Sequence, residues 1–443
     1  MIFKLVRYQL LAFFVILGGI LFAQTDSNYN QLKLSEAIEI GLSNNKKLQI
    51  RSLQTEVAKT HEKDLKNDKY PDVNFHTGFA KLSTLRQFEH GIFNPSTKYK
   101  IPGEQYDFTL SADIPIYLGG KIKNEEKKAE IETEISKLKT RKDERALRME
   151  IITAYLQVLH LQEQQDLIVD KMHEDTLVIK QTKALKKNGA VTYNEVLRTE
   201  LQLSNHKMLF SELNNEIDIL EHKVKTILAL PEEVHVHLDT KELFTTTDHI
   251  GLVDEMVKEA YEQSESLKIA EEEYHLKEID KKLTRANVLP KITGGGKYGY
   301  SYPNFLFFPP EEFLYRFGSI GININIPISN FFKNKQKMQI ADQQIAIAKL
   351  EIEEKEEEIT HEVFAAYKRL EDATEKIEIA EEAIEQAKEN YRIVKTKYIN
   401  KLSLITELID ADNAFLEAES NLISLQINKQ LKYYQLQYVL GNL

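Results

Sequence analysis

The chain has 443 residues, of which 29% are charged and 42% hydrophobic, a balance typical of a folded and largely helical protein rather than a disordered one. Its formal net charge of -11 argues against a nucleic-acid partner, because proteins that bind nucleic acids concentrate positive charge. The sequence contains no cysteine, which excludes disulfides, thiol chemistry and lipid attachment to an N-terminal cysteine.

Residues 1–23 are predicted to be a secretory signal peptide. Lys4 and Arg7 precede an apolar run over residues 10–22, and Ala23 is a suitable cleavage residue. The run is short for a membrane-spanning helix, and no later stretch of 18 apolar residues follows it. A membrane role for the mature chain would therefore have to use strands.

The mature chain is predicted to be a duplicated unit. The first structural repeat covers residues 24–231, a linker covers 232–250, and the second repeat covers 251–443. Equivalent positions before the strands are shifted by 219 residues, as in Leu48 and Leu267, and those after the strands by 212, as in Glu195 and Glu407. Pro71 and Pro115 are 44 residues apart in the first repeat, whereas their counterparts Pro290 and Pro327 are 37 apart in the second. The difference of seven residues therefore belongs to one loop. Duplication of a structural unit explains both shifts.

Each repeat is predicted to contain one β-hairpin, over residues 71–117 and 290–329. The clearest strand has isoleucine at every second position from Ile320 to Ile328, with small or polar residues between them. Strands of this length can cross an outer membrane when tilted, but an open sheet would leave backbone groups unpaired there. Four strands cannot close a useful pore. A membrane role thus requires several copies that share one barrel.

Long helical hairpins are predicted over residues 119–230 and 331–440, because glycine and proline are nearly absent there. In the second repeat, apolar or small residues alternate at steps of four and three from Ile359 to Tyr398, which is the heptad pattern of a coiled coil. The first repeat follows the pattern less regularly from Leu147 to Met172. Each hairpin is expected to turn near residues 186–192 or 398–404.

Several short segments, in this order, resemble the TolC-like outer-membrane factor (outer membrane efflux protein) family. They are Leu34-Ser-Glu-Ala-Ile, Tyr70-Pro71 and Leu289-Pro290, Pro115-Ile-Tyr-Leu-Gly-Gly120, Ala154-Tyr155, and Glu407-Leu-Ile-Asp410-Ala411. The resemblance covers nearly all of the mature chain. It implies a mainly α fold with a membrane β-barrel portion, in which four strands per protomer contribute to a trimeric 12-stranded barrel and the long helices form a periplasmic α-helical barrel.

The resemblance also implies a function. Such a protein is an outer-membrane channel, the passive exit duct of a tripartite efflux or type I secretion system, with its helical tunnel in the periplasm. The expected partners are two further copies in a homotrimer, a periplasmic adaptor (membrane fusion) protein, an inner-membrane transporter and outer-membrane lipid, with no nucleic acid, cofactor or metal.

By the same resemblance, Glu407 and Asp410 match the acidic residues that ring the periplasmic pore gate. The adaptor-docking helical tips correspond to Gly189, Ala190, Val191 and Thr192 in the first repeat and to Lys401 and Leu402 in the second. Lys401 departs from the family pattern, which usually has glycine there. The ordinary interpretation is that Glu407 and Asp410 are solvated helix residues and that Gly189 is a helix C-cap.

The main alternative is a soluble periplasmic coiled-coil protein with a structural or adaptor role. It explains the heptads equally well, but it does not explain why both repeats place an alternating hairpin at the same point. An enzyme is not indicated, since no carboxylate pair, catalytic triad or metal-ligand set stands out.

Overall fold

The computed structural model describes residues 29–231, 233–234, 236–238, 251–308 and 310–443. The predicted signal peptide and most of the predicted linker lie outside these residues. The chain divides into two compact units, each built from both repeats. Of the described residues, those within Met1–Lys46, Glu144–Met256 and Glu362–Leu443 form unit 1, and those within Lys47–Asp143 and Val257–His361 form unit 2.

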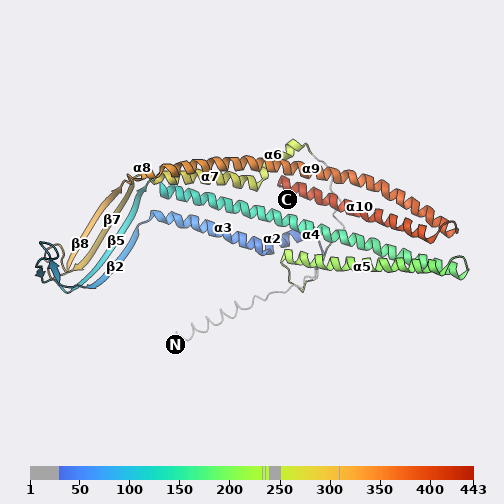
Figure 1. Cartoon of the computed structure of the whole chain (residues 1–443), viewed down its shortest axis with the longest axis horizontal. Coiled ribbons are helices and arrows are strands. Elements are labelled where there is room, and N and C mark those ends of the chain that lie inside the picture. Colours follow the sequence, from blue (N-terminus) through green and yellow to red (C-terminus); the bar gives the residue numbers. More distant parts are fainter. Residues whose placement is uncertain (1–28, 232, 235, 239–250, 309) are drawn as a thin grey trace, which may run out of the picture. The chain divides into compact units, whose positions relative to one another are not determined.

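Unit 2 contains a four-stranded antiparallel sheet, from one end of which its helices extend (Figure 1). Its strands are β2 (Asp72–Lys81), β5 (Glu104–Leu118), β7 (Lys291–Tyr302) and β8 (Tyr315–Asn325), hydrogen-bonded in the order β2-β5-β7-β8. A smaller hairpin of β3 (Leu85–Gln87) and β4 (Thr97–Tyr99) lies in the connection from β2 to β5. Each repeat therefore supplies one hairpin, and the two hairpins join through β5 and β7.

The register of the sheet separates an apolar face from a polar one. Val73 pairs with Ala112, Ala112 with Gly296, and Gly296 with Ile320, so these four residues share a face. The neighbouring row of Asn74, Ser111, Lys297 and Ser319 lies on the other face. The predicted alternation of β8 is confirmed, and its apolar side is uncovered in the chain, with Ile320 93% exposed.

Neighbouring glycines of β7 face opposite sides of this sheet. A Cβ on Gly294 would lie 3.1–3.3 Å from the side chains of Ile116 and Ile114 on the apolar face. A Cβ on Gly295 would lie 2.5 Å from Asp113 on the polar face. The glycine run therefore makes room for larger side chains of β5 on both faces.

The helices of unit 2 lead into and out of this sheet. They are α3 (Lys46–Leu65), η1 (Lys66–Lys69), the first part of α4 (Lys121–Lys187), most of α6 (Val253–Gln263), α7 (Glu265–Ala286), α8 (Asn330–Lys333) and the first part of α9 (Lys335–Ile399). Hydroxyl groups connect α3 to α4, where Thr55 Oγ1 lies 2.9 Å from Ser136 Oγ and 3.0 Å from Thr140 Oγ1. Such contacts satisfy buried polar groups between closely packed helices.

Unit 1 contains α2 (Leu34–Asn44), the rest of α4, α5 (Tyr193–Leu228), the rest of α9 and α10 (Ile405–Leu440). The strands β1 (Tyr29–Leu32) and β6 (Val236–Leu238) form a parallel pair. Tyr155 of α4 is fully buried and donates a hydrogen bond of 2.9 Å to the carbonyl oxygen of Leu32. This bond attaches the N-terminal strand to the helical core.

The predicted heptad of α9 is confirmed by burial. Residues at its seam positions are buried or half-buried along the whole helix, including Ile359, Val363, Ala366, Leu370, Ala373, Ala380, Tyr391 and Tyr398. Small residues at a seam allow neighbouring helices to approach closely. None of the described helices has a stretch apolar and long enough to cross a membrane.

Candidate functional site

The turn between α4 and α5 forms the first helical tip. Gly189 adopts φ +67°, and its N–H donates to the carbonyl of Lys186 while the N–H of Ala190 donates to that of Leu185. This pair of bonds is the Schellman pattern that ends a helix. The backbone N–H of Thr192 then donates to Glu195 Oε1 at 3.1 Å, so a carboxylate caps the start of α5.

The turn between α9 and α10 forms the second tip with the same backbone bonds. Lys401 adopts φ +61°, its N–H donates to the carbonyl of Tyr398, and that of Leu402 donates to Lys397. Lysine thus occupies a left-handed position that favours glycine, at a cost of roughly 1–2 kcal/mol. The departure from glycine changes the energy of the turn rather than its shape. The neighbouring Leu402 is 77% exposed.

Glu407 and Asp410 lie in the first two turns of α10, and both are exposed in the chain. Their spacing of three places them on one side of the helix. Ser403 donates a hydrogen bond to Glu407. The first repeat uses the equivalent Glu195 as a helix cap instead, so Glu407 has a different local role from its counterpart.

A buried ionic core lies farther from the tips, where helices of both repeats pack together in unit 1. Its centre is Lys171 of α4, which is only 4% exposed. The Nζ of Lys171 lies 3.0 Å from Asp412 of α10, 3.6 Å from Glu174 and 3.7 Å from Glu419. The same nitrogen lies 4.5 Å from the ring centre of Phe415, within the range of a cation–π contact.

Two further groups extend this ionic core. Glu174 accepts hydrogen bonds from Tyr391 and Lys395 of α9. Asp175 lies 2.7 Å from Nδ1 of His206 on α5, and both side chains are buried. Charged groups from α4, α5, α9 and α10 therefore meet in one network, in which the carboxylates outnumber the lysines.

Burial and neighbouring charges shift the pKa values of this core in opposite directions. Burial raises the pKa of Asp412, and the attraction of Lys171 does not fully offset it. Burial likewise raises the pKa of Glu419. Burial alone would raise the pKa of Glu174, but the hydrogen bonds from Lys395 and Tyr391 outweigh burial and hold this pKa below its ordinary value. Burial, followed by the bond to Glu174, raises the pKa of Tyr391.

The ionic core was not among the sites expected from the sequence. A signal was present, because the heptad of α4 continues to Asp175 and Thr182, where the equivalent α9 positions hold Ala387 and Val394. Polar residues at buried seam positions need partners, and they mark a place where another helix supplies them. Among the described residues, no group of three or more acidic, histidine or cysteine side chains is arranged to hold a metal ion.

The family model described as outer membrane efflux protein matches residues 37–229 and 256–442 of the chain. The two matched segments correspond to the two repeats and leave out the predicted linker. No curated protein matches the chain significantly.

Solved structures with the same fold are outer-membrane proteins. The outer-membrane channel OprN is 18% identical, with a TM-score of 0.77 over 92% of this chain and 90% of that chain. The outer membrane protein VceC from Vibrio cholerae is 15% identical, with a TM-score of 0.74 over 92% and 96%. The CmeC outer membrane channel from Campylobacter jejuni is 13% identical, with a TM-score of 0.74 over 92% and 85%. These similarities confirm the predicted fold class.

Proposed function

The chain belongs to the outer membrane efflux protein family, and from this premise we propose that three copies assemble into the exit duct of a tripartite efflux or type I secretion system. Members of the family are outer-membrane channels that form trimers and work with adaptors and inner-membrane pumps. Three copies with four strands each supply twelve strands to a shared barrel. Closure of that barrel pairs the outer edges of β2 and β8, which an open sheet in a membrane would leave unpaired.

The two-faced sheet is the observation that carries this proposal. Its apolar face, with Phe75, Phe79 and Ile320, matches the lipid-facing surface of a membrane barrel, and its polar face suits a water-filled interior. A soluble coiled-coil protein would expose the same apolar face to water. The barrel assembly therefore accounts for the sheet better than the soluble alternative does.

We expect the two tips to receive the periplasmic adaptor. The first tip comprises Gly189, Ala190, Val191 and Thr192, and the second comprises Lys401 and Leu402. Both turns present short, defined loops at the ends of long helices. Leu402 of the second tip and Leu404, which follows it, are exposed apolar residues. Exposed apolar side chains beside polar ones are typical of a protein-binding surface.

Glu407 and Asp410 are proposed to line the periplasmic pore gate. In a three-fold assembly each residue occurs three times around one axis, and six carboxylates there would favour cations over anions. Their exposure on one side of α10 is compatible with this role.

The assembly is tested by isolating the protein from outer membranes in detergent and measuring its mass and single-channel conductance. A conducting trimer is expected. Ile320→Lys places a charge on the proposed lipid face and should make assembly less favourable by about 2–4 kcal/mol. The adjacent Ser319→Lys faces the proposed interior and should leave the trimer intact. A water-soluble monomer, or equal effects of the two lysines, would overturn the proposal.

The gate is tested in the same bilayer assay with Glu407→Ala and Asp410→Ala combined. We expect a loss of cation preference, because the change removes six negative charges from the proposed constriction. The matched control is Glu378→Ala with Glu381→Ala, which removes an exposed pair of the same spacing from α9. Unchanged ion selectivity in the first variant would assign Glu407 and Asp410 to a solvated surface.

A further inference from the structure

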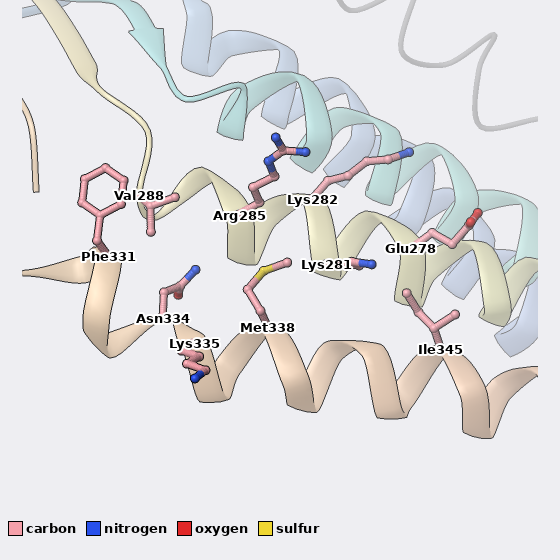
Figure 2. Close-up of a pocket in the computed structure, with 10 residues that line it drawn as sticks. All are labelled: Glu278, Lys281, Lys282, Arg285, Val288, Phe331, Asn334, Lys335, Met338 and Ile345. Atoms are coloured by element: carbon pink, nitrogen blue, oxygen red, sulfur yellow. The ribbon is translucent and has the colours of Figure 1, made fainter. Parts of the chain in front are cut away.

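A groove in unit 2 combines positive charge with an apolar floor (Figure 2). Its volume is about 770 Å³, and it runs between α7 on one side and α8 with the start of α9 on the other. Figure 2 shows that α7 supplies the cations Lys282 and Arg285, while Phe331 and Met338 come from α8 and α9. A space of this size accommodates a headgroup together with part of an attached chain.

The groove lies where strands give way to helices. Val288 lies between the end of α7 and the start of β7, and Phe331 lies in α8, a few residues after β8 ends. Phe331 is 59% exposed and follows the exposed Ile326 and Ile328, which continue the apolar run of β8. If the strands cross the outer membrane, this junction lies at its periplasmic surface, where lipid phosphates and acyl chains meet.

Three of the four cations that line the groove have no ion-pair partner among the described residues. Lys281 pairs with Asp342 at 2.6 Å, but Lys282, Arg285 and Lys335 form no ion pair within the described part of the chain. Glu278, the acidic residue of the lining, lies at the end away from Phe331 and accepts a hydrogen bond from His275 (Figure 2). The lining therefore carries a net positive charge, and Arg285 and Lys335 are its cations nearest Phe331.

Two asparagines fix the walls of the groove. Asn330 Nδ2 donates to the carbonyl oxygen of Asn287 at 2.8 Å, and Asn334 Nδ2 donates to that of Thr284 at 2.8 Å. Asn334 is itself buried. These bonds connect the end of α7 to the start of α9, so the backbone that carries the cations and the apolar residues of the groove is held in place.

The first repeat lacks such a surface at the equivalent junction. Lys69 occupies the place of Val288 and Glu126 that of Met338, and these two form an ion pair of 2.6 Å. Lys66, the counterpart of Arg285, pairs with Glu62 at 2.9 Å. The two junctions share one backbone plan. In the first repeat ion pairs engage Lys66 and Lys69, whereas in the second repeat the equivalent positions hold the unpaired Arg285 and the apolar Val288.

We propose that this groove binds an anionic glycerophospholipid of the periplasmic leaflet of the outer membrane. Lys282, Arg285 and Lys335 supply the positive charge that attracts the anionic headgroup, and Val288, Phe331 and Met338 contact the upper part of an acyl chain. The proposal rests on the membrane placement given under the proposed function. It adds a lipid site that anchors the second repeat at the membrane surface.

The test is native mass spectrometry of the purified trimer, titrated in detergent with dioleoylphosphatidylglycerol. The wild-type trimer should retain lipid, and the triple variant Lys282→Gln, Arg285→Gln, Lys335→Gln should bind it at least about tenfold more weakly. The matched control, Lys63→Gln, Lys66→Gln, Lys123→Gln, removes the equivalent charges of the first repeat and should bind like wild type. Trimer mass and conductance should be unchanged in both variants, which separates a failure of this site from a failure of the channel.

A second variant preserves net charge. Val288→Lys with Met338→Glu installs the ion pair of the first repeat in the groove and should abolish lipid binding in a folded trimer. Equal lipid binding by all variants would overturn the proposal. It would also be overturned if inorganic phosphate displaced the lipid at equal concentration, or if the variants separated into monomers, which would assign the groove to a contact between copies.

Discussion

The helices α4 and α9 occupy equivalent places in the two repeats, yet their buried sides differ in chemistry. The seam of α9 consists of small and apolar residues such as Ala373 and Ala380. The matching stretch of α4 contains Lys171, Asp175 and Thr182, all buried. The positions equivalent to these three in α9 are Ala383, which is exposed, and Ala387 and Val394, which are half-buried.

This difference shows that the two repeats have become complementary partners rather than remaining copies. Lys171 of the first repeat pairs with Asp412 of the second, and the position in the first repeat equivalent to Asp412 is Glu200, which forms a surface pair with Lys183. Duplication gave both repeats one backbone plan. The ion pair between the repeats uses Lys171 and Asp412, whereas their counterparts Ala383 and Glu200 form no such pair across the repeats.

Removing the cation of the buried core is the strongest way to break this complementarity. Lys171→Met should lower the free energy of unfolding of unit 1 by about 3–5 kcal/mol, because Asp412, Glu174 and Glu419 would lose their shared counter-charge. Urea unfolding followed by circular dichroism measures the change. The control is Lys183→Met, which removes a lysine from an exposed pair of 2.7 Å and should cost about 0–1 kcal/mol. Equal losses would mean that the ionic core contributes no more than a surface pair.

A smaller effect should appear in the pH dependence of stability. Burial raises the pKa of Asp412 and Glu419, so the folded unit binds their protons more tightly than the unfolded chain does. Their contribution to stability is fully present below the unfolded pKa of about 4 and is lost as the pH rises through the raised values, so the free energy of unfolding should increase as the pH is lowered from neutral toward about 4.

Glu174 acts in the opposite sense at lower pH. Its pKa lies below the ordinary value, so its contribution is present above the unfolded pKa and is lost as the pH falls below about 4. The other charged or titratable groups of this core are Lys171, Asp175, His206, Tyr391 and Lys395. In a series of urea unfolding curves, Asp412→Asn should reduce the increase in the free energy of unfolding that accompanies the fall in pH from neutral toward about 4. A variant with the wild-type pH profile would exclude Asp412 as a source of it.

The fold was predictable because its signals repeat along the chain. The heptad of α9 and the alternation of β8 each recur over many residues, so single exceptions do not hide them. The ionic core and the cationic groove depend instead on which side chains meet in space, and Lys171 and Asp412 are 241 residues apart. Comparing equivalent positions of the two repeats provides a signal for both sites. Asp175 is equivalent to Ala387, and Glu126 is equivalent to Met338.

The tips allow the smallest and most local test of how the repeats compare. Gly189 and Lys401 have nearly the same positive φ, and a Cβ on Gly189 would meet no atom within 4 Å, so only backbone preference separates the two residues. Lys401→Gly should slow hydrogen exchange at the second tip, by up to about 1 kcal/mol in opening free energy.

The reverse substitution serves as the control for the tip exchange. Gly189→Lys should accelerate exchange at the first tip by a similar amount, measured at the amides of Gly189, Ala190, Lys401 and Leu402, whose N–H groups form the equivalent bonds. Because each change moves one tip toward the other's sequence, the two effects should have opposite signs. Changes of the same sign would show that contacts of the lysine side chain, rather than its left-handed backbone, determine the stability of these turns.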